Sequence, residues 1–539
     1  MRARVIIAAA LLLSLVAWDF AAGTTFVGDD YLFLAFARLE PNPLLAFTRD
    51  MHGGEYYRPV PMLLWWLLDR AGQGASWPFA LAGFLLHVGS AALVVALGRG
   101  VGFSLRVSLA AGALFLVAPA EREAALWFSA STDLLATLAT LGAVVCLLRA
   151  ASNEGAREAR GVGGVGCPSR NPRGEVRRRP TRLGWQAASV ALAGLAYFSK
   201  ETALVLPILG VAAKWAVSVD SSRRPPAAEN TERRGERTEL LRRLVVPVFP
   251  HLVVAAGYVA IRSVVLRGWG GTNDPVAPWW GRALQLVSGL VHSVTAYAPL
   301  PEALAWFLGG GVLLAAGVFA VRAARHINGR TWFPIFWTLL ACLPLPAAGW
   351  VVGARYFYLP AVGLTLMLAL AAGTRGAAAT IAAISLLAAM GLGSTATRVG
   401  EVRRYRAVLA AAHDAVAEGV QAGHTIFLVR SAVKDLDLAL KLRWTMGPQP
   451  LLVIPDVPAS FVWMPDALAA RAGFLLAKPP LPPTGEYRFG GQHIVGLARR
   501  EEAPDLDEVL ARLPEIRFIE LVVDGRGQVT GRDETASRR

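Results

Sequence analysis

The stretch GDDYLFLAFARLEPNPLLAFTRDMHGGEYYRPVP occupies Gly28–Pro61 and gathers ionisable side chains beside the first apolar run of the chain. It opens with two adjacent carboxylates, Asp29 and Asp30, and closes with the tetrapeptide YYRP, which contains Arg58. Most of the remaining sequence is apolar. In a membrane protein, ionisable groups beside a spanning segment mark the place where function is expected. We therefore predict that this stretch carries the functional site.

The composition is that of a polytopic membrane protein. Of 539 residues, 54% are hydrophobic and 17% are charged, and the mean hydropathy is +0.44. These values exclude an ordinary soluble domain. A net charge of +15 could indicate nucleic-acid binding, but the arginines cluster between apolar runs, which favours cytoplasmic loops. The three cysteines show no disulfide framework and no zinc spacing, so no metal site is predicted from them.

About eleven runs approach the roughly 20 apolar residues that a transmembrane helix needs. They lie within residues 1–395 and predict an all-α polytopic membrane bundle. The short run Met62–Leu68 is instead predicted to lie at the membrane interface, with Trp65 and Trp66 at headgroup depth. The run Arg282–Pro299 either lies flat on the membrane or spans it, and spanning would reverse the orientation of everything that follows.

The positive-inside rule orients this bundle. If Arg282–Pro299 does not span, the arginine-rich connections and the N-terminus share one side, the cytoplasm. Two of these connections, 149–182 and 218–243, are predicted to be disordered because they are polar and cannot bury a core. The opposite face receives the first outer loop, 23–61, and polar residues from distant parts of the chain. These are Glu121, Glu123, Lys200, Glu201, Asp274 and Arg355.

The chain changes character near Thr395. Residues 396–539 are mixed and charged, with no spanning run, and short β-rich runs alternate with helix-like stretches such as Glu401–Glu418. This pattern predicts a small soluble α/β domain on the extracytoplasmic side. The predicted strands are Thr425–Val429, Leu451–Ile454, Phe474–Leu476, Ile494–Leu497 and Phe518–Val523.

The two carboxylates at the outer end of the first apolar run can serve as bases. Transfer of a group to a hydroxyl needs a base that accepts the proton of the acceptor, and Asp29 or Asp30 is placed for this role, with Asp30 preferred. The second carboxylate could raise its neighbour's pKa or help to hold a divalent cation. The alternative is that both are solvated loop residues.

Three cations are candidates for binding a phosphate group. Arg58 offers a planar fork, Lys200 lies in the SKET segment between two apolar runs, and Arg355 opens a late apolar run. Simpler interpretations are a snorkelling arginine in an aromatic belt, or, for Lys200-Glu201, a helical-hairpin turn. Asp133, near the start of the fourth apolar run, either faces the bundle interior or stays at headgroup depth.

The order of these motifs resembles the GT-C glycosyltransferases. It is most similar to the membrane half of the transmembrane-and-TPR O-mannosyltransferases and the related protein O-mannosyltransferases, over about Val5–Thr395. The residues that carry the resemblance are Asp29-Asp30, Tyr57-Arg58-Pro59, Glu123, Asp133 before a double leucine, Lys200-Glu201 and Arg355-Tyr356. A predicted α/β domain stands in place of the family's TPR array, and the fourth motif reads APAEREA rather than HP-V-H-T-E. Donor and acceptor are therefore left open.

The resemblance implies a GT-C-like bundle of eleven helices in a bacterial inner membrane, with its site on the periplasmic face. It implies a hexosyltransferase that moves a sugar from a polyprenyl-phosphate carrier to a hydroxyl on a protein, lipid or glycan. The first-loop aspartate would act as base, and Arg58, Lys200 and Arg355 would stabilise the leaving phosphate. Two other classes stay open: a lipid-phosphate phosphotransferase, and a lipid or polysaccharide transporter without transfer chemistry.

Overall fold

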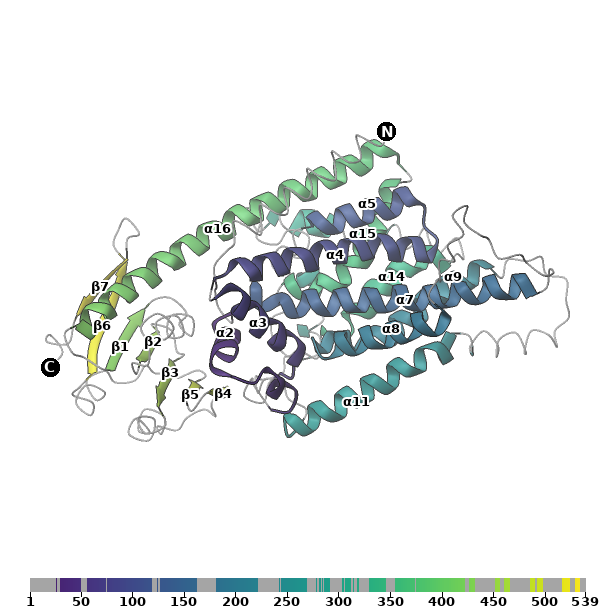
Figure 1. Cartoon of the computed structure of the whole chain (residues 1–539). Coiled ribbons are helices and arrows are strands. Elements are labelled where there is room, and N and C mark those ends of the chain that lie inside the picture. Colours follow the sequence, from purple (N-terminus) through teal and green to yellow (C-terminus); the bar gives the residue numbers. More distant parts are fainter. Residues whose placement is uncertain are drawn as a thin grey trace, which may run out of the picture.

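A computed structural model shows a helical bundle, one very long helix and a β-sheet (Figure 1). The structure describes residues 26, 30–49, 56–73, 75–118, 124, 127–161, 181–221, 242, 244–268, 278, 281–282, 284, 286–290, 303–304, 306–311, 314, 318, 329–345, 354–373, 375–421, 426–431, 451–455, 460–465, 485–489, 492–497, 516–523 and 529–533.

Six helical segments within these residues are long and apolar enough to cross a membrane, and the protein is an integral membrane protein. The bundle contains α4 (Trp77–Val101), α5 (Leu105–Val117), α7 (Ser131–Gly161), α8 (Arg182–Tyr197), α9 (Leu206–Ser221), α11 (Phe249–Val265), α14 (Gly329–Cys342) and α15 (Tyr358–Gly373). The predicted first span, Val5–Ala22, lies outside the described residues, so the number of eleven stays a prediction.

Helix α7 forms the centre of the bundle and α11 its periphery. The span Phe128–Ser152 is 78% buried, whereas Val246–Val265 is 17% buried and turns apolar side chains outward, as a lipid-facing helix does. Because α7 continues to Gly161, the connection predicted to be disordered from residue 149 begins later than expected. A buried histidine connects α4, α5 and α15. His87 of α4 forms hydrogen bonds with the Tyr358 hydroxyl of α15 and the Leu116 carbonyl of α5.

The first outer loop folds into short helices at one end of the bundle (Figure 1). They are α2 (Asp30–Leu39), η1 (Pro43–Phe47) and α3 (Pro59–Gly72). Pro43 and Pro59 each occupy the first turn of a helix, where a missing N–H costs nothing. Three more 3₁₀ turns lead into the membrane helices: η2 (Phe128–Ala130), η3 (Glu201–Val205) and η6 (Ala354–Phe357).

The prediction of Trp65 at headgroup depth is wrong. Trp65 is fully buried, packs on Phe33 of α2 and Phe79 of α4, and donates its indole N–H to Ser131 Oγ at 3.0 Å. Because Ser131 satisfies that N–H inside the protein, the ring needs no water at the interface. Trp66, by contrast, is half-buried and donates to the Glu40 carbonyl. Thus α3 is a packed part of the bundle rather than a surface anchor.

Helix α16 (Ala377–Gln421) runs without a break from the bundle to the sheet. The predicted span after Gly376 and the predicted helical stretch Glu401–Glu418 are therefore one element of 45 residues. It packs against β6 and β7 of the sheet.

The sheet has seven strands in the order β4-β5-β3-β2-β1-β6-β7. The pairs β1–β2 and β1–β6 are parallel and the others antiparallel. The strands are β1 (Ile426–Ser431), β2 (Leu451–Pro455), β3 (Ser460–Pro465), β4 (Gly485–Phe489), β5 (Gln492–Leu497), β6 (Ile516–Val523) and β7 (Val529–Asp533). Edge strand β4 lies against α2, at the same end of the bundle as the first outer loop.

Four predicted strands correspond to β1, β2, β5 and β6, whereas β3, β4 and β7 were not predicted. The predicted strand Phe474–Leu476 lies outside the described residues. Most residues between the strands do as well, so the α/β character of this domain stays a prediction.

Candidate functional site

The predicted site residues come from five separate segments that meet at the α2 end of the bundle (Figure 1). Asp29 and Glu123 lie outside the described residues. The others are Asp30 at the start of α2, Tyr57 and Arg58 before α3, Asp133 in the first turn of α7, Lys200 and Glu201 at the start of η3, and Arg355 and Tyr356 in η6.

Lys200 and Asp133 form a sealed ion pair. Lys200 Nζ lies 2.6 Å from each carboxylate oxygen of Asp133, and the two side chains are only 3% and 5% exposed. Asp133 therefore faces the bundle interior, which decides between its two predicted placements. Burial lowers the pKa of the Lys200 ammonium below its usual value, against the opposing effect of Asp133. The Asp133 carboxylate therefore stabilises the charged form of the buried Lys200 side chain.

Glu201 pairs with two arginines rather than with its neighbour Lys200. Its Oε2 accepts from Arg58 Nε at 3.1 Å and Nη2 at 3.0 Å, and its Oε1 accepts from Arg262 Nη1 at 2.8 Å. Burial alone would lower the pKa of the Arg58 guanidinium, but the charge of Glu201 raises it above its ordinary value. The Arg58 guanidinium therefore remains cationic at any working pH.

Arg355 and Lys200 are held against aromatic faces. The Arg355 guanidinium lies 4.0 Å from the centre of the Trp127 ring and 5.3 Å from that of Tyr356, and Lys200 Nζ lies 4.3 Å from the same Tyr356 ring. Such cation–π contacts are typically worth about 0.5–2 kcal/mol. They fix the direction of two cations without neutralising their charge.

Asp30 is fully buried and anchors the first outer loop to the start of the α7 segment. Its Oδ1 accepts a hydrogen bond of 2.6 Å from the backbone N–H of Ser129, which lies in η2. A short charge-assisted bond of this kind is about twice as strong as a neutral one. The Asp30 side chain therefore connects the start of α2 to the segment that leads into α7.

Tyr57 has a structural environment. Its hydroxyl donates to the Phe47 carbonyl at 2.8 Å, its own carbonyl accepts from the Tyr258 hydroxyl at 3.2 Å, and its ring stacks on that of Tyr258. Burial raises its pKa to about 12. Tyr57 therefore positions the residue that follows it, Arg58, rather than exchanging protons near neutrality.

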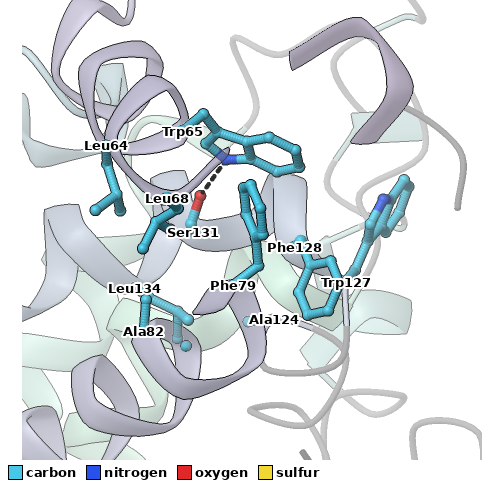
Figure 2. Close-up of a pocket in the computed structure, with 11 residues that line it drawn as sticks. Leu64, Trp65, Leu68, Phe79, Ala82, Ala124, Trp127, Phe128, Ser131 and Leu134 are labelled. Carbon is cyan, nitrogen blue, oxygen red and sulfur yellow. Dashed lines mark hydrogen bonds between the residues drawn. The ribbon is translucent and has the colours of Figure 1, made fainter. Parts of the chain in front are cut away.

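An apolar pocket adjoins these charges, between α3, α4 and the start of α7 (Figure 2). It is small, and its lining includes Trp65, Phe79, Phe128, Leu68 and Leu134. Trp127 lines it too and carries Arg355 on its ring, so the pocket and the cations share one wall. An apolar surface and a set of cations thus lie side by side.

Solved structures supply the comparison that identifies the fold. No protein-family model matches the sequence, and no curated protein matches it. ArnT from Cupriavidus metallidurans, in the apo state, aligns over 92% of this chain and 98% of its own, with a TM-score of 0.51 and 14% identity. The same protein bound to undecaprenyl phosphate aligns over the same shares, with a TM-score of 0.50. The archaeal oligosaccharyltransferase AglB from Archaeoglobus fulgidus, in complex with an inhibitory peptide and a dolichol-phosphate, covers 80% of this chain and 63% of its own at a TM-score of 0.39 and 11% identity.

The chain has the GT-C fold. This confirms the fold that the order of the motifs implied. The GT-C bundle brings Asp30, Arg58, Asp133, Lys200 and Arg355 to one end although they are spread over more than three hundred positions.

Two residues of the candidate site were not predicted from the sequence. Arg262 lies one turn before the end of α11, and only its place in an apolar run of 17 residues could have singled it out. Trp127 precedes η2. It could have been found because it stands two residues before the segment SASTD, which ends in Asp133. Within the described residues, no group of three or more His, Cys, Asp or Glu lies close enough to hold a metal ion.

Proposed function

We propose that this protein is a membrane glycosyltransferase that moves a sugar from a polyprenyl-phosphate carrier to a hydroxyl acceptor. The supporting observation is the convergence of three guanidiniums, Arg58, Arg262 and Arg355, beside an apolar pocket at the α2 end of a GT-C bundle, with Lys200 held by Asp133 next to them. A carrier of this kind has one anionic phosphate and a long apolar chain, which match these two surfaces. The capture of undecaprenyl phosphate by ArnT, which has the same fold, adds support.

The chemistry follows from where charge develops. The acceptor oxygen attacks the anomeric carbon, the bond from that carbon to the phosphate oxygen breaks, and the acceptor proton passes to a first-loop carboxylate. The anomeric configuration is inverted, because attack is opposite to the leaving group. The products are the glycosylated acceptor and polyprenyl phosphate, whose added negative charge the cations stabilise.

The contacts of Asp30 support a division of labour between the two adjacent carboxylates. Asp30 is buried and its Oδ1 binds the Ser129 N–H, which suits an anchor for the loop. We therefore assign the proton transfer to Asp29, which reverses the preference for Asp30 drawn from the sequence. Glu123 and a divalent cation at the acidic pair remain part of the proposal as auxiliary groups.

The proposal includes the orientation of the chain. The α2 end of the bundle and the strands after α16 face the periplasm of a bacterial inner membrane, and the N-terminus is cytoplasmic. Residues 396–539 form an extracytoplasmic α/β domain, and residues 1–395 form the catalytic membrane domain of eleven helices. The position of β4 against α2 supports a domain that stands over the site and meets the acceptor.

The test is transfer by the purified protein from a panel of polyprenyl-phosphate hexoses to hydroxyl acceptors. We expect Asp29→Asn to lower the rate by about 10²- to 10⁴-fold because it removes the base. We expect Asp30→Asn to lower the rate and the melting temperature together, because an amide oxygen accepts more weakly from Ser129. Glu40→Gln, a charge-matched change on the same loop, is the control and should leave transfer unchanged.

Three outcomes are decisive. Full transfer by both aspartate variants would remove the first-loop carboxylates from the mechanism. Loss of rate in Asp30→Asn with an unchanged melting temperature, and none in Asp29→Asn, would return the base to Asp30. Movement of the phosphate together with the sugar would make the protein a phosphotransferase.

A further inference from the structure

We propose that Glu201 is a positioning residue that sets two guanidiniums, those of Arg58 and Arg262, for the phosphate of the donor. This inference rests on the proposed function and goes beyond it. Arg262 belongs to no motif in the sequence, and Glu201, as an anion in an anion-binding site, would ordinarily be expected to oppose binding.

The geometry of the three side chains is that of a bridge. Arg58 comes from the segment before α3, Glu201 from η3 and Arg262 from α11, so three parts of the chain meet at one carboxylate. Each carboxylate oxygen serves a different arginine, at 3.0 Å for Arg58 Nη2 and 2.8 Å for Arg262 Nη1. The carboxylate thereby holds the two guanidiniums close together, and its two bonds from Arg58 also fix the plane of that guanidinium.

The bridge is open to a ligand, whereas the neighbouring ion pair is closed. The exposed fractions are 14% for the Arg58 side chain, 24% for Glu201 and 13% for Arg262. For Lys200 and Asp133 they are 3% and 5%. The sealed pair therefore acts as a structural support, and the open bridge is the part that a phosphate can reach.

The charge of the bridge also suits a phosphodiester. Two guanidiniums and one carboxylate carry a net charge of one positive unit. Without Glu201 the two like charges would repel each other and their side chains would separate. With it, they remain close while one positive charge is left to meet the single negative charge of a sugar phosphodiester.

A simpler role for Glu201 predicts the opposite result. If Glu201 only neutralises arginines or ties α11 to η3, then Glu201→Gln removes a negative charge from an anion site and binding of a phosphate becomes tighter. If Glu201 positions the arginines, the same change weakens binding, since the lost geometry outweighs the lost repulsion. The sign of the effect separates the two roles.

The experiment measures binding of decaprenyl phosphate and of decaprenol to the full-length protein in nanodiscs. We expect Glu201→Gln and Arg262→Gln each to weaken decaprenyl phosphate binding about tenfold, the usual effect of losing a charged hydrogen bond, with decaprenol binding unchanged. Arg267→Gln, which removes the same charge just beyond α11 at an exposed position, is the matched control and should have less than a twofold effect.

Each result bears on one proposal. Equal binding of decaprenyl phosphate and decaprenol by the wild type would overturn the proposed function itself. Phosphate-selective wild-type binding with tighter or unchanged binding by Glu201→Gln would overturn only the positioning role. If Glu201→Gln does not fold, Arg262→Lys decides: it keeps the charge but not the planar fork, and we expect a loss of about fivefold rather than none.

Discussion

At the scale of single residues, the α2 end of this bundle separates buried, paired charges from charges that are more exposed. The Lys200–Asp133 pair is buried, and Lys200 Nζ also lies over the Tyr356 ring. The Arg58–Glu201–Arg262 bridge and Arg355 are more open. A buried pair adds little net stability, but the loss of one partner is costly because a desolvated charge is left behind.

We therefore predict that Asp133→Asn destabilises the protein by about 3–5 kcal/mol. Lys200 would remain buried with a neutral amide in place of its counter-ion. The measurement is the loss of folded protein on heating in detergent, followed by intrinsic tryptophan fluorescence. The double variant Asp133→Asn with Lys200→Met should recover a good part of the loss. Equal destabilisation by the single and double variants would mean that the pair is not coupled.

Sequence reasoning found most of these residues but not their partners. The carboxylates and cations stood out because ionisable groups are rare in this sequence and lie at the ends of apolar runs. Their pairing could not be predicted, because Lys200 and Glu201 are neighbours that turn to different partners, Asp133 on one side and Arg262 on the other. Such choices depend on which helices lie side by side.

At the scale of helices, α14 and α15 are in unusually close contact. A Cβ on Gly363 of α15 would collide with the Thr338 side chain and with the backbone of α14 at Pro334. Thr338 Oγ1 in turn donates to the Pro334 carbonyl of its own helix at 3.0 Å. Small residues that let helix backbones approach are the usual device of membrane bundles.

We predict that Gly363→Ala destabilises the bundle by about 1–3 kcal/mol through overpacking. Gly257→Ala in α11 is the matched control, because a Cβ there meets nothing within 4 Å. That change should be neutral or stabilising by up to about 1 kcal/mol, the ordinary advantage of alanine over glycine in a helix. Comparable melting temperatures for both variants would show that α14 and α15 can separate without cost.

The elements themselves were predicted unevenly. Apolar runs located the membrane helices well, since length and hydropathy decide them. The short β-rich runs located β1, β2, β5 and β6 but missed the inner strand β3 and the edge strands β4 and β7. The break expected between the last span and the following helix was wrong, because arginines such as Arg398 continue the helix of α16 once it has left the apolar layer.

At the scale of the whole molecule, every predicted site residue in the described part of the chain lies at the end of the bundle that α2 and α3 cover (Figure 1). The ends of α7 and α9, at Gly161 and Ser221, lie at the other end. One end thus carries the candidate site residues, and the other the last described residues before the two arginine-rich stretches. This arrangement is the one that the positive-inside rule requires if the site is extracytoplasmic.

We predict that alkaline phosphatase fused after Gln73 or after Gln421 is active in a bacterial host, and that fusions after Gly102 or Ser221 are inactive. The enzyme folds only in the periplasm, so its activity reports the side of each position. The Gln421 fusion also decides the side on which the sheet lies. Activity after Ser221 together with silence after Gln73 would invert the molecule and remove the periplasmic site.

Because α16 is one continuous helix, the distance between the sheet and the membrane depends on the thickness of the bilayer. At 1.5 Å per residue, α16 is about 68 Å long. Its part Ala377–Thr397 is long and apolar enough to cross a membrane, and the rest of the helix extends beyond that part. A thicker or thinner bilayer slides or tilts such a helix. The packing of β4 against α2 would then change with membrane composition.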